Sequence, residues 1–256
     1  MKNIAGREEK HIWKNMFIVI NFRRVAGFFI ICCIIAIILS VHFTRGHVAA
    51  IAVEPIYQGD ENNKTMALTC NVFWGEEYIG RMLEVLEEKD VSMTFFIGGT
   101  WAEKFSGLVK EIYDRGHEIG SHGYSHPHPD KISRKENIQD IAKAEKVIYG
   151  ITGEKPRLYA PPYGERGPAV LEAARELGYH TILWTIDTVD WQRPAPEVII
   201  QRVLNKTENG AIVLMHPTAP TVHALPSIID GLKEEGYQLI TVGEMLKQLP
   251  VNKNEG

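Results

Sequence analysis

From residue 64 onward, the chain alternates short apolar runs with longer segments that carry an amphipathic helical pattern. The apolar runs are typical of strands buried on both faces, and they fall at residues 65–73, 91–98, 117–123, 180–187 and 210–216. The amphipathic segments fall at residues 77–90, 105–116, 133–150, 168–178, 196–204 and 225–236. This alternation predicts an α/β fold in which helices cover a parallel sheet. An open doubly wound sheet and a closed barrel give the same pattern.

Local signals mark where several of these helices begin and end. Ser133 and Glu136 have the spacing of a capping box, and Gly116 suits the end of the helix before it. The last three helical segments carry proline at or near the expected first turn, at Pro168, Pro196 and Pro226.

The amino-terminal region has a different character from the rest of the chain. Residues 25–43 form an uncharged apolar run, close to the roughly 20 residues that span a bilayer. Arg23 and Arg24 precede it, which favours a cytoplasmic amino terminus. We therefore expect a cytoplasmic tail at 1–24, a transmembrane helix at 25–43, a spacer at 44–63 and an extracytoplasmic domain at 64–250. A cleaved signal peptide is the alternative, since small residues follow the run.

Composition excludes some classes of protein. The chain has 256 residues, 45% of them hydrophobic, which is enough to bury one large core. The net charge of −4 and the lack of a basic stripe give no reason to expect nucleic acid as a partner. Cys32 and Cys33 lie in the apolar run and Cys70 is alone, so no disulfide framework is implied. We expect a monomer.

Two histidines follow the third predicted strand. His122 and His126 are four residues apart in a segment whose glycine and prolines favour a turn, and neutral imidazoles at this spacing suit Zn²⁺ or a similar metal. From spacing alone, a polar loop explains the pair as well as a metal site does. His128 and Asp130 are further candidates for the same cluster.

Three more clusters follow predicted strands. Residues 160–167 form a loop that proline and glycine make rigid. Asp187 and Asp190 precede Trp191, so that an acid could orient a histidine beside an aromatic face, although a turn or a helix cap explains them equally well. His216 ends an apolar strand, where a polar side chain is costly unless it has a hydrogen-bond partner or a functional role.

Taken together, these motifs resemble those of the polysaccharide deacetylase family, the carbohydrate esterases that remove N-acetyl or O-acetyl groups from glycans such as chitin and peptidoglycan. The resemblance runs from about Met66 to Leu249 and rests on four ordered motifs: S-H-x-x-S-H, P-P-Y-G, D-x-x-D-W and L-x-H. It implies a distorted (β/α) barrel of about seven strands. The D-T-V-D-W-Q segment and the tryptophan-glycine turn are similar to those of sporulation-associated deacetylases.

The resemblance also implies roles for particular residues. His122 and His126 match metal-binding histidines, and the expected cofactor is a divalent metal such as Zn²⁺. His216 matches the general acid that protonates the leaving amine, and Asp190 matches the acid that orients it.

The expected substrate contacts come from the same alignment. The backbone N–H of Tyr163 matches the group that helps to hold the oxyanion, and Trp191 matches a wall of the sugar groove. Pro162 and Trp74 are expected to contact the substrate beside them.

Two positions depart from the family pattern. The first motif, T-F-D-D-G in the family, reads Thr69-Cys70-Asn71-Val72 here, so Asn71 replaces the catalytic base and an apolar residue replaces a metal-binding aspartate. In the family an arginine pairs with the base, and Ala160 occupies that position here. An arginine without its acidic partner would be costly, so the two changes form one compensated substitution. Glu76, Glu77 and Asp187 are candidates to replace the lost carboxylate.

These departures leave more than one function open. An amide cannot accept a proton near neutral pH, and general-base catalysis is worth roughly 10² to 10⁴ in rate. We expect a membrane-anchored hydrolase that removes acetyl groups from cell-wall glycan, with reduced activity. The alternative is a catalytically inactive glycan-binding protein on the same scaffold, and a different metal-dependent amidase or esterase is a third reading.

Overall fold

The computed structural model describes residues 33–35 and 54–249. The chain divides into two compact units, Met1–Ala52 and Val53–Gly256, and the second contains residues 54–249. The predicted anchor at 25–43 lies outside the described residues except for 33–35, which are helical. Among the residues described, no helix has the length and apolar character needed to cross a membrane.

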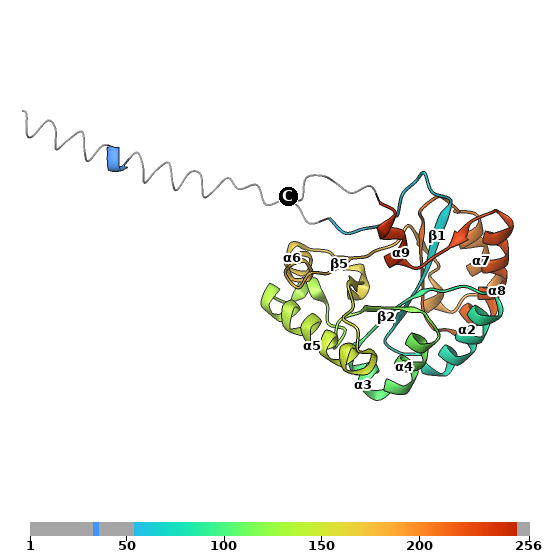
Figure 1. The fold of residues 1–256 in the computed structure, drawn as a ribbon, viewed down its shortest axis with the longest axis horizontal. Helices are drawn as coiled ribbons and strands as arrows, with labels where there is room; N and C mark the ends of the chain where they lie inside the picture. The colour runs from blue at the N-terminus through green and yellow to red at the C-terminus, as the bar shows by residue number, and fades with distance from the viewer. Residues whose placement is uncertain (1–32, 36–53, 250–256) are drawn as a thin grey trace, which may run out of the picture. The chain divides into compact units, whose positions relative to one another are not determined.

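A curled parallel sheet forms the centre of the second unit (Figure 1). Seven strands follow the order β5-β4-β3-β2-β1-β7-β6, and β8 pairs with the start of β1. Every pair of these strands is parallel. The α/β prediction is therefore confirmed, and the sheet is a half-barrel. Its strands are β1 (Thr65–Val72), β2 (Thr94–Ile97), β3 (Glu118–Ser121), β4 (Leu158–Tyr159), β5 (His180–Thr181), β6 (Ile186–Asp187), β7 (Ile212–Met215) and β8 (Gln238–Leu239).

Part of the segment expected to be a spacer joins the sheet. Ile56 forms a parallel bridge to Ile182, just after β5, and Gln58 forms an antiparallel bridge to Ala211, just before β7. The side chain of Gln58 also donates to the carbonyl oxygen of Asn209 at 2.7 Å. Residues 54–59 therefore connect the two sides of the curled sheet near the amino-terminal end of β7.

Most helices lie around the outside of the sheet (Figure 1), whereas α9 packs against its inner face. Three single 3-10 turns, η1 (Pro129–Lys131), η2 (Pro162–Gly164) and η3 (Asp190–Gln192), occur in the connecting loops. The helices are α2 (Glu76–Glu88), α3 (Gly99–Lys104), α4 (Ser106–Asp114), α5 (Arg134–Thr152), α6 (Pro168–Glu176), α7 (Pro196–Leu204), α8 (Ala219–Glu234) and α9 (Val242–Lys247).

The helix boundaries test the local signals in the sequence. The capping box at Ser133 is present, with reciprocal bonds between Ser133 and Glu136 at the start of α5. The expected start near Pro226 is wrong, because α8 begins at Ala219 and Pro226 lies inside it. The reason is an earlier cap: the side chain of Thr218 accepts a hydrogen bond from the backbone N–H of Thr221.

Side chains of β1 alternate between two apolar layers, as the pleat of a strand requires. Leu68, Cys70 and Val72 pack in the layer between the sheet and the helices. Ala67 packs in a separate cluster inside the curled sheet, together with residues of β4, β7 and α9. Asn71, four residues after Ala67, lies on the same inward face of the strand.

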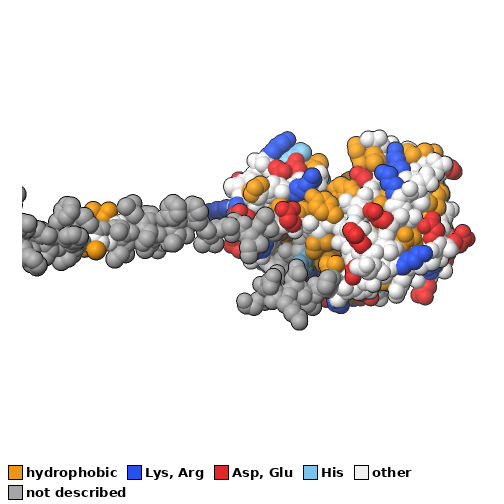
Figure 2. Space-filling view, turned by 90° about the horizontal axis from the view of Figure 1, so that it is seen from above, with side chains coloured by type: hydrophobic (Ala, Val, Ile, Leu, Met, Phe, Trp, Pro, Cys, Tyr) orange, Lys and Arg blue, Asp and Glu red, His pale blue; other side chains and the backbone are white. Residues whose placement is uncertain are grey.

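Charged side chains of both signs lie on the surface of the described domain. Figure 2 shows acidic and basic side chains interspersed on the face of the described domain that it draws, with no patch of one sign.

Candidate active site

A cavity of about 430 Å³ opens at the carboxyl ends of the strands, where α/β folds place their functional loops. Most of the residues singled out from the sequence meet there. Those that line it are Asn71, Trp74, His122, His126, Tyr163, Asp187, Trp191 and His216. Four further lining residues were not singled out: Phe73, Gly164, Trp184 and Leu214.

His216 and Asp190 form a tightly bonded pair at this cavity. His216 follows β7, and its Nδ1 lies 2.8 Å from Oδ1 of Asp190. The Oδ2 atom of Asp190 accepts from the backbone N–H of His216 at 2.7 Å and from the hydroxyl of Thr221 at 2.6 Å. Asp190 is fully buried. Because the carboxylate accepts the Nδ1 proton, Nε2 of His216 is left for the cavity, and the imidazole is held in one orientation.

His122 follows β3, and its side chain is held by the backbone of the loop that follows β4. Its Nδ1 lies 2.7 Å from the carbonyl oxygen of Ala160, so Nδ1 carries the proton and Nε2 keeps a free lone pair. Burial lowers the pKa of His122 to about 3, with His126 adding to the effect, so the ring is neutral at neutral pH.

His126 lies beside His122, with ring centroids 4.9 Å apart. Burial lowers the pKa of His126 as well. The turn between the two histidines is fixed by Asp140, whose carboxylate accepts from the backbone N–H groups of Tyr124 and Ser125. The loop predicted from glycine and proline is thus present, and His126 has a left-handed backbone with φ of 56°.

The further candidates His128 and Asp130 take part in a hydrogen-bond network beside the cavity. His128 stacks on Tyr163 with centroids 4.0 Å apart, and its Nδ1 lies 2.7 Å from Oε1 of Glu165. The other oxygen of Glu165 accepts the N–H of Asp130, which in turn accepts the N–H of Gly167. This network joins the histidine loop to the loop at 160–167.

Tyr163 sits on that joined loop in a left-handed conformation, with φ of 60°. Its ring is 58% exposed and also meets the ring of His126 at 4.7 Å. Gly164 follows, and a Cβ there would approach the indole of Trp184 to 2.7 Å, so glycine is required. Pro162 is buried in the same turn and does not belong to the cavity lining.

Tryptophan side chains surround the cavity. Trp74 lies parallel to His216, with 6.0 Å between ring centroids, and Trp191 is 54% exposed. Trp184 lines the cavity because the predicted strand at 180–187 is interrupted: β5 ends at Thr181 and β6 begins at Ile186. A tryptophan just before the acidic cluster was the available signal for it. Exposed indole faces suit the apolar faces of sugar rings.

Asn71 occupies the inward-facing position at the end of β1. It is 6% exposed, and its Oδ1 atom is buried without a hydrogen-bond partner among the described residues. Cys70 pairs with Met215 in the strand register, so Asn71 comes level with His216 on the neighbouring strand. The thiol of Cys70 points into the helix-facing layer, and burial raises its pKa, so it stays protonated.

The residues present do not complete the metal site that the resemblance implies. Catalytic Zn²⁺ takes three protein ligands. Val72 packs in the helix-facing layer, and Glu76 and Glu77 do not line the cavity. Asp187 does line it, but one of its oxygens accepts from the N–H of Val189. Across residues 33–35 and 54–249, no three His, Cys, Asp or Glu side chains come together as a metal-binding group.

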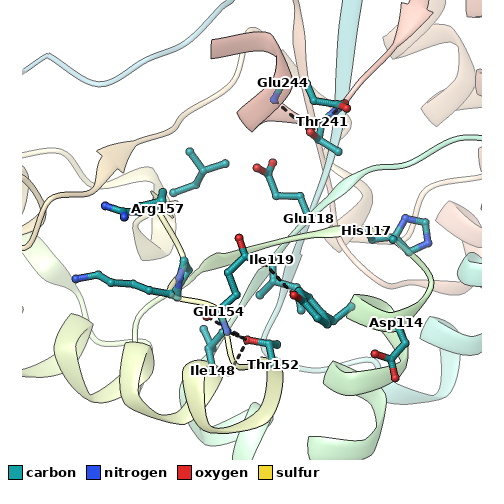
Figure 3. A pocket seen from close by; sticks show the side chains of 15 residues that line it. Asp114, His117, Glu118, Ile119, Ile148, Thr152, Glu154, Arg157, Thr241 and Glu244 are labelled. Carbon is teal, nitrogen blue, oxygen red and sulfur yellow. Dashed lines mark hydrogen bonds between the residues drawn. The ribbon is translucent and has the colours of Figure 1, made fainter. Parts of the chain in front are cut away.

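A second cavity of about 570 Å³ lies at the opposite ends of the strands (Figure 3). Glu118, the first residue of β3, accepts from the hydroxyl of Thr94 at 2.7 Å and from the N–H of Gly243 at 2.9 Å. Burial raises the pKa of Glu118. Glu244 accepts from Thr241 in the cap of α9. These polar groups serve to connect α9 with β2 and β3.

Comparison with known proteins decides the family. The sequence profile of the polysaccharide deacetylases matches residues 58–182. A peptidoglycan-N-acetylglucosamine deacetylase of Bacillus cereus is 34% identical over 196 residues, which cover 75% of this chain and 71% of that protein. This chain belongs to the polysaccharide deacetylase family.

Two other relatives are closer in sequence. YlxY of Bacillus subtilis is 41% identical over 202 residues, or 79% of this chain, and the match spans 63% of the length of YlxY. The crystal structure of BA3943 of Bacillus anthracis, a CE4 family pseudoenzyme, superposes with a TM-score of 0.76 at 42% identity, covering 78% of this chain and 72% of that one. A mutant of BA3943 has restored enzymatic activity.

Within the polysaccharide deacetylase family, the relatives thus include both named deacetylases and a pseudoenzyme. The deacetylases are hydrolases that act on carbon–nitrogen bonds of acetylated sugars. Family members generally depend on a divalent metal, and here the donor set is reduced to His122 and His126.

Proposed function

We propose that this domain binds N-acetylated cell-wall glycan in the cavity at the strand ends and hydrolyses its acetyl groups slowly. The observation that carries the proposal is the intact acid half of the site. His216 is oriented by a buried carboxylate, and its Nε2 faces a cavity lined by tryptophan side chains. Both features are present although the base is absent. A named peptidoglycan deacetylase among the relatives supports the choice of glycan.

The chemistry of amide hydrolysis divides between two sides of the scissile bond. Water attacks the acetyl carbon and loses a proton to solvent, the C–N bond breaks, and the amine leaves with a proton from His216 that solvent then replaces. The backbone N–H of Tyr163 is the group expected to hold the oxyanion that forms between these steps. A divalent metal, as in other members of the family, would polarise the acetyl oxygen, and of the side chains that would hold it this chain has only His122 and His126.

Activation of the attacking water is the part of the reaction that this site supports least. Asn71 stands where the family has a carboxylate, and an amide can position a water molecule but cannot take its proton. The loss of a general base costs roughly 10² to 10⁴ in rate. The expected activity is therefore well below that of family members that keep both carboxylates.

Binding without turnover is the second candidate function. It is favoured by the inward Asn71, by Val72 facing the helices, and by the similarity to the BA3943 pseudoenzyme. A glycan-binding protein needs the tryptophan walls and the rigid loops, and it has no need of a base.

We further propose the cellular setting that the amino-terminal pattern suggests. An anchor at residues 25–43 would keep the domain outside the cytoplasm, where cell-wall glycan is found. The link to sporulation stays a prediction from the D-T-V-D-W-Q segment.

The decisive experiment measures acetate released from N-acetylated peptidoglycan fragments and chitin oligosaccharides by the full chain, with and without added divalent metals. Deacetylation predicts slow release that is abolished in His216→Ala. Glycan binding in the same samples, with no acetate under any metal, would rule out the first function and leave the second.

A further inference from the structure

A short segment that precedes β1, which we define as the strap (residues 54–59), pairs with the backbone just after β5. The N–H of Ile56 donates to the carbonyl oxygen of Thr181 at 2.8 Å, and the carbonyl oxygen of Ile56 accepts from the N–H of Leu183 at 2.8 Å. Leu183 immediately precedes Trp184, which lines the cavity at the strand ends. The strap therefore fixes the backbone from which one wall of the cavity projects.

Trp184 lies in the interruption between β5 and β6, where the strap takes the place of regular strand pairing. On one side of Trp184, the N–H and the hydroxyl of Thr185 both bond to the carbonyl oxygen of Ile212 in β7. On the other side, the N–H of Leu183 bonds to the strap. The side chains of Ile56 and Trp184 also pack against the same apolar cluster inside the curled sheet. Loss of the strap would therefore remove the bond on one side of Trp184 and part of the apolar packing around it.

The strap also contacts the loop at 160–167, which forms the adjoining wall of the cavity. The guanidinium carbon of Arg166 lies over the ring of Tyr57, 5.9 Å from its centroid. Gly164 in the same loop lies so close to the indole of Trp184 that a Cβ would not fit between them. The two walls thus touch each other, and the strap contacts both.

We propose that Ile56 and Tyr57 are positioning residues for the glycan cavity. Neither residue is among those that line the cavity, so each acts through the wall that it contacts: Ile56 through Trp184, and Tyr57 through the loop at 160–167. This inference rests on the proposed function, because it concerns how the same cavity binds glycan. Docking of the strap and binding of glycan are then linked, and each strengthens the other by the same factor.

Ile56→Asp tests the action through Trp184, because a carboxylate without a partner is costly to bury and the strap must leave the apolar cluster. Binding of chitin oligosaccharide to the full chain is followed by NMR titration. The affinity should fall by up to roughly tenfold, the effect expected for one aromatic wall, and no further than in Trp184→Ala. The double variant should bind no more weakly than Trp184→Ala alone, since both changes act on the same wall. Ile56→Val, which keeps an apolar side chain, should bind like wild type.

The contact of Tyr57 with the loop is tested by removing either partner. Arg166→Gln should weaken binding by roughly two- to fivefold, the range for one exposed contact between a cation and an aromatic ring, and Tyr57→Ala should do the same. The two changes together should cost no more than either alone, whereas two separate contacts with glycan would add. The matched control is Lys64→Gln, which removes a cation from the ring of Tyr237 and should leave the affinity unchanged.

The wild-type chain provides a measurement that does not depend on the folding of any variant. Saturating chitin oligosaccharide should slow amide hydrogen exchange at Ile56 and Leu183, although neither residue lines the cavity. Exchange at Val91, which is bonded to Leu86 in the turn after α2, should not change.

Two results would overturn the inference while leaving glycan binding in place. One is unchanged exchange at Ile56 and Leu183 in protein saturated with glycan. The other is additive losses of affinity in Ile56→Asp and Trp184→Ala, because a strap that only stabilises the fold would add its effect to that of the wall. If the wild-type chain binds neither chitin oligosaccharide nor any peptidoglycan fragment, the proposed function falls and the inference with it.

Discussion

At the scale of the residue, catalytic competence turns on the pair of positions 71 and 160. Both lie on the inward face of the curled sheet, Asn71 at the end of β1 and Ala160 just after β4. In the family these positions carry opposite charges that pair with each other. The structure is therefore consistent with one compensated change. Once the acid was lost, the arginine that pairs with it would have been a buried charge without a partner, which is destabilising.

Restoring that pair should restore part of the chemistry. We predict that Asn71→Asp with Ala160→Arg raises acetate release above wild type, by up to about 10²-fold, because a carboxylate can accept the proton that an amide cannot. Asn71→Asp alone should gain less, since its charge would be buried without a partner. Acetate release from chitin oligosaccharides measures both. A double variant no faster than wild type would show that the missing metal ligand, and not the base, limits the reaction.

At the scale of the element, Asp190 connects three segments. It begins η3 after β6, and its carboxylate accepts from His216 after β7 and from Thr221 in α8. Val189, just before it, has a left-handed backbone with φ of 52°. The arrangement orients His216 and at the same time ties the first turn of α8 to the loop after β6.

Two substitutions separate these effects. Asp190→Asn should lower the free energy of unfolding by several kcal/mol, because its N–H groups would oppose buried donors, and should abolish acetate release. Thr221→Val removes one of the three hydrogen bonds and should cost about 1 kcal/mol with His216 still oriented. Urea unfolding measures the first quantity, and product assays the second. Equal losses of activity in the two variants would contradict an orienting role for Asp190.

The elements also show how far the sequence could predict this site. The capping box of α5 was predictable because it depends only on two residues close in the sequence. The side chains of Ser133 and Glu136 each accept a hydrogen bond from the other residue's backbone N–H. Neighbouring residues of a strand point to opposite faces, so Asn71 and Val72 must diverge, but only the packed sheet shows which face is the interior. The break between β5 and β6 that admits Trp184 depends on pairing with β4 and β7, which no local pattern encodes.

At the scale of the whole molecule, buried titratable groups couple stability to pH. His117, just before β3, is 6% exposed, and its Nδ1 accepts from the N–H of Met93 at 3.4 Å. Burial, and after it the charge of Arg115, lowers the pKa of His117 to about 4. Glu118 next to it has a raised pKa because of burial, so it works in the opposite direction.

The sign for His117 follows from proton binding. Between pH 6.5 and 4 the unfolded chain binds a proton at this histidine and the folded chain does not, so stability falls as pH falls through that window. One such group contributes a slope of at most about 1.4 kcal/mol per pH unit. His117→Gln keeps an acceptor for Met93 and does not titrate, so its urea midpoint should decline less steeply than that of wild type from pH 6.5 to 4. Because His122 has its own pKa of about 3, part of the slope should persist in the variant. Identical slopes in the two proteins would mean that His117 takes up its proton without unfolding, through local opening at the amino-terminal end of β3.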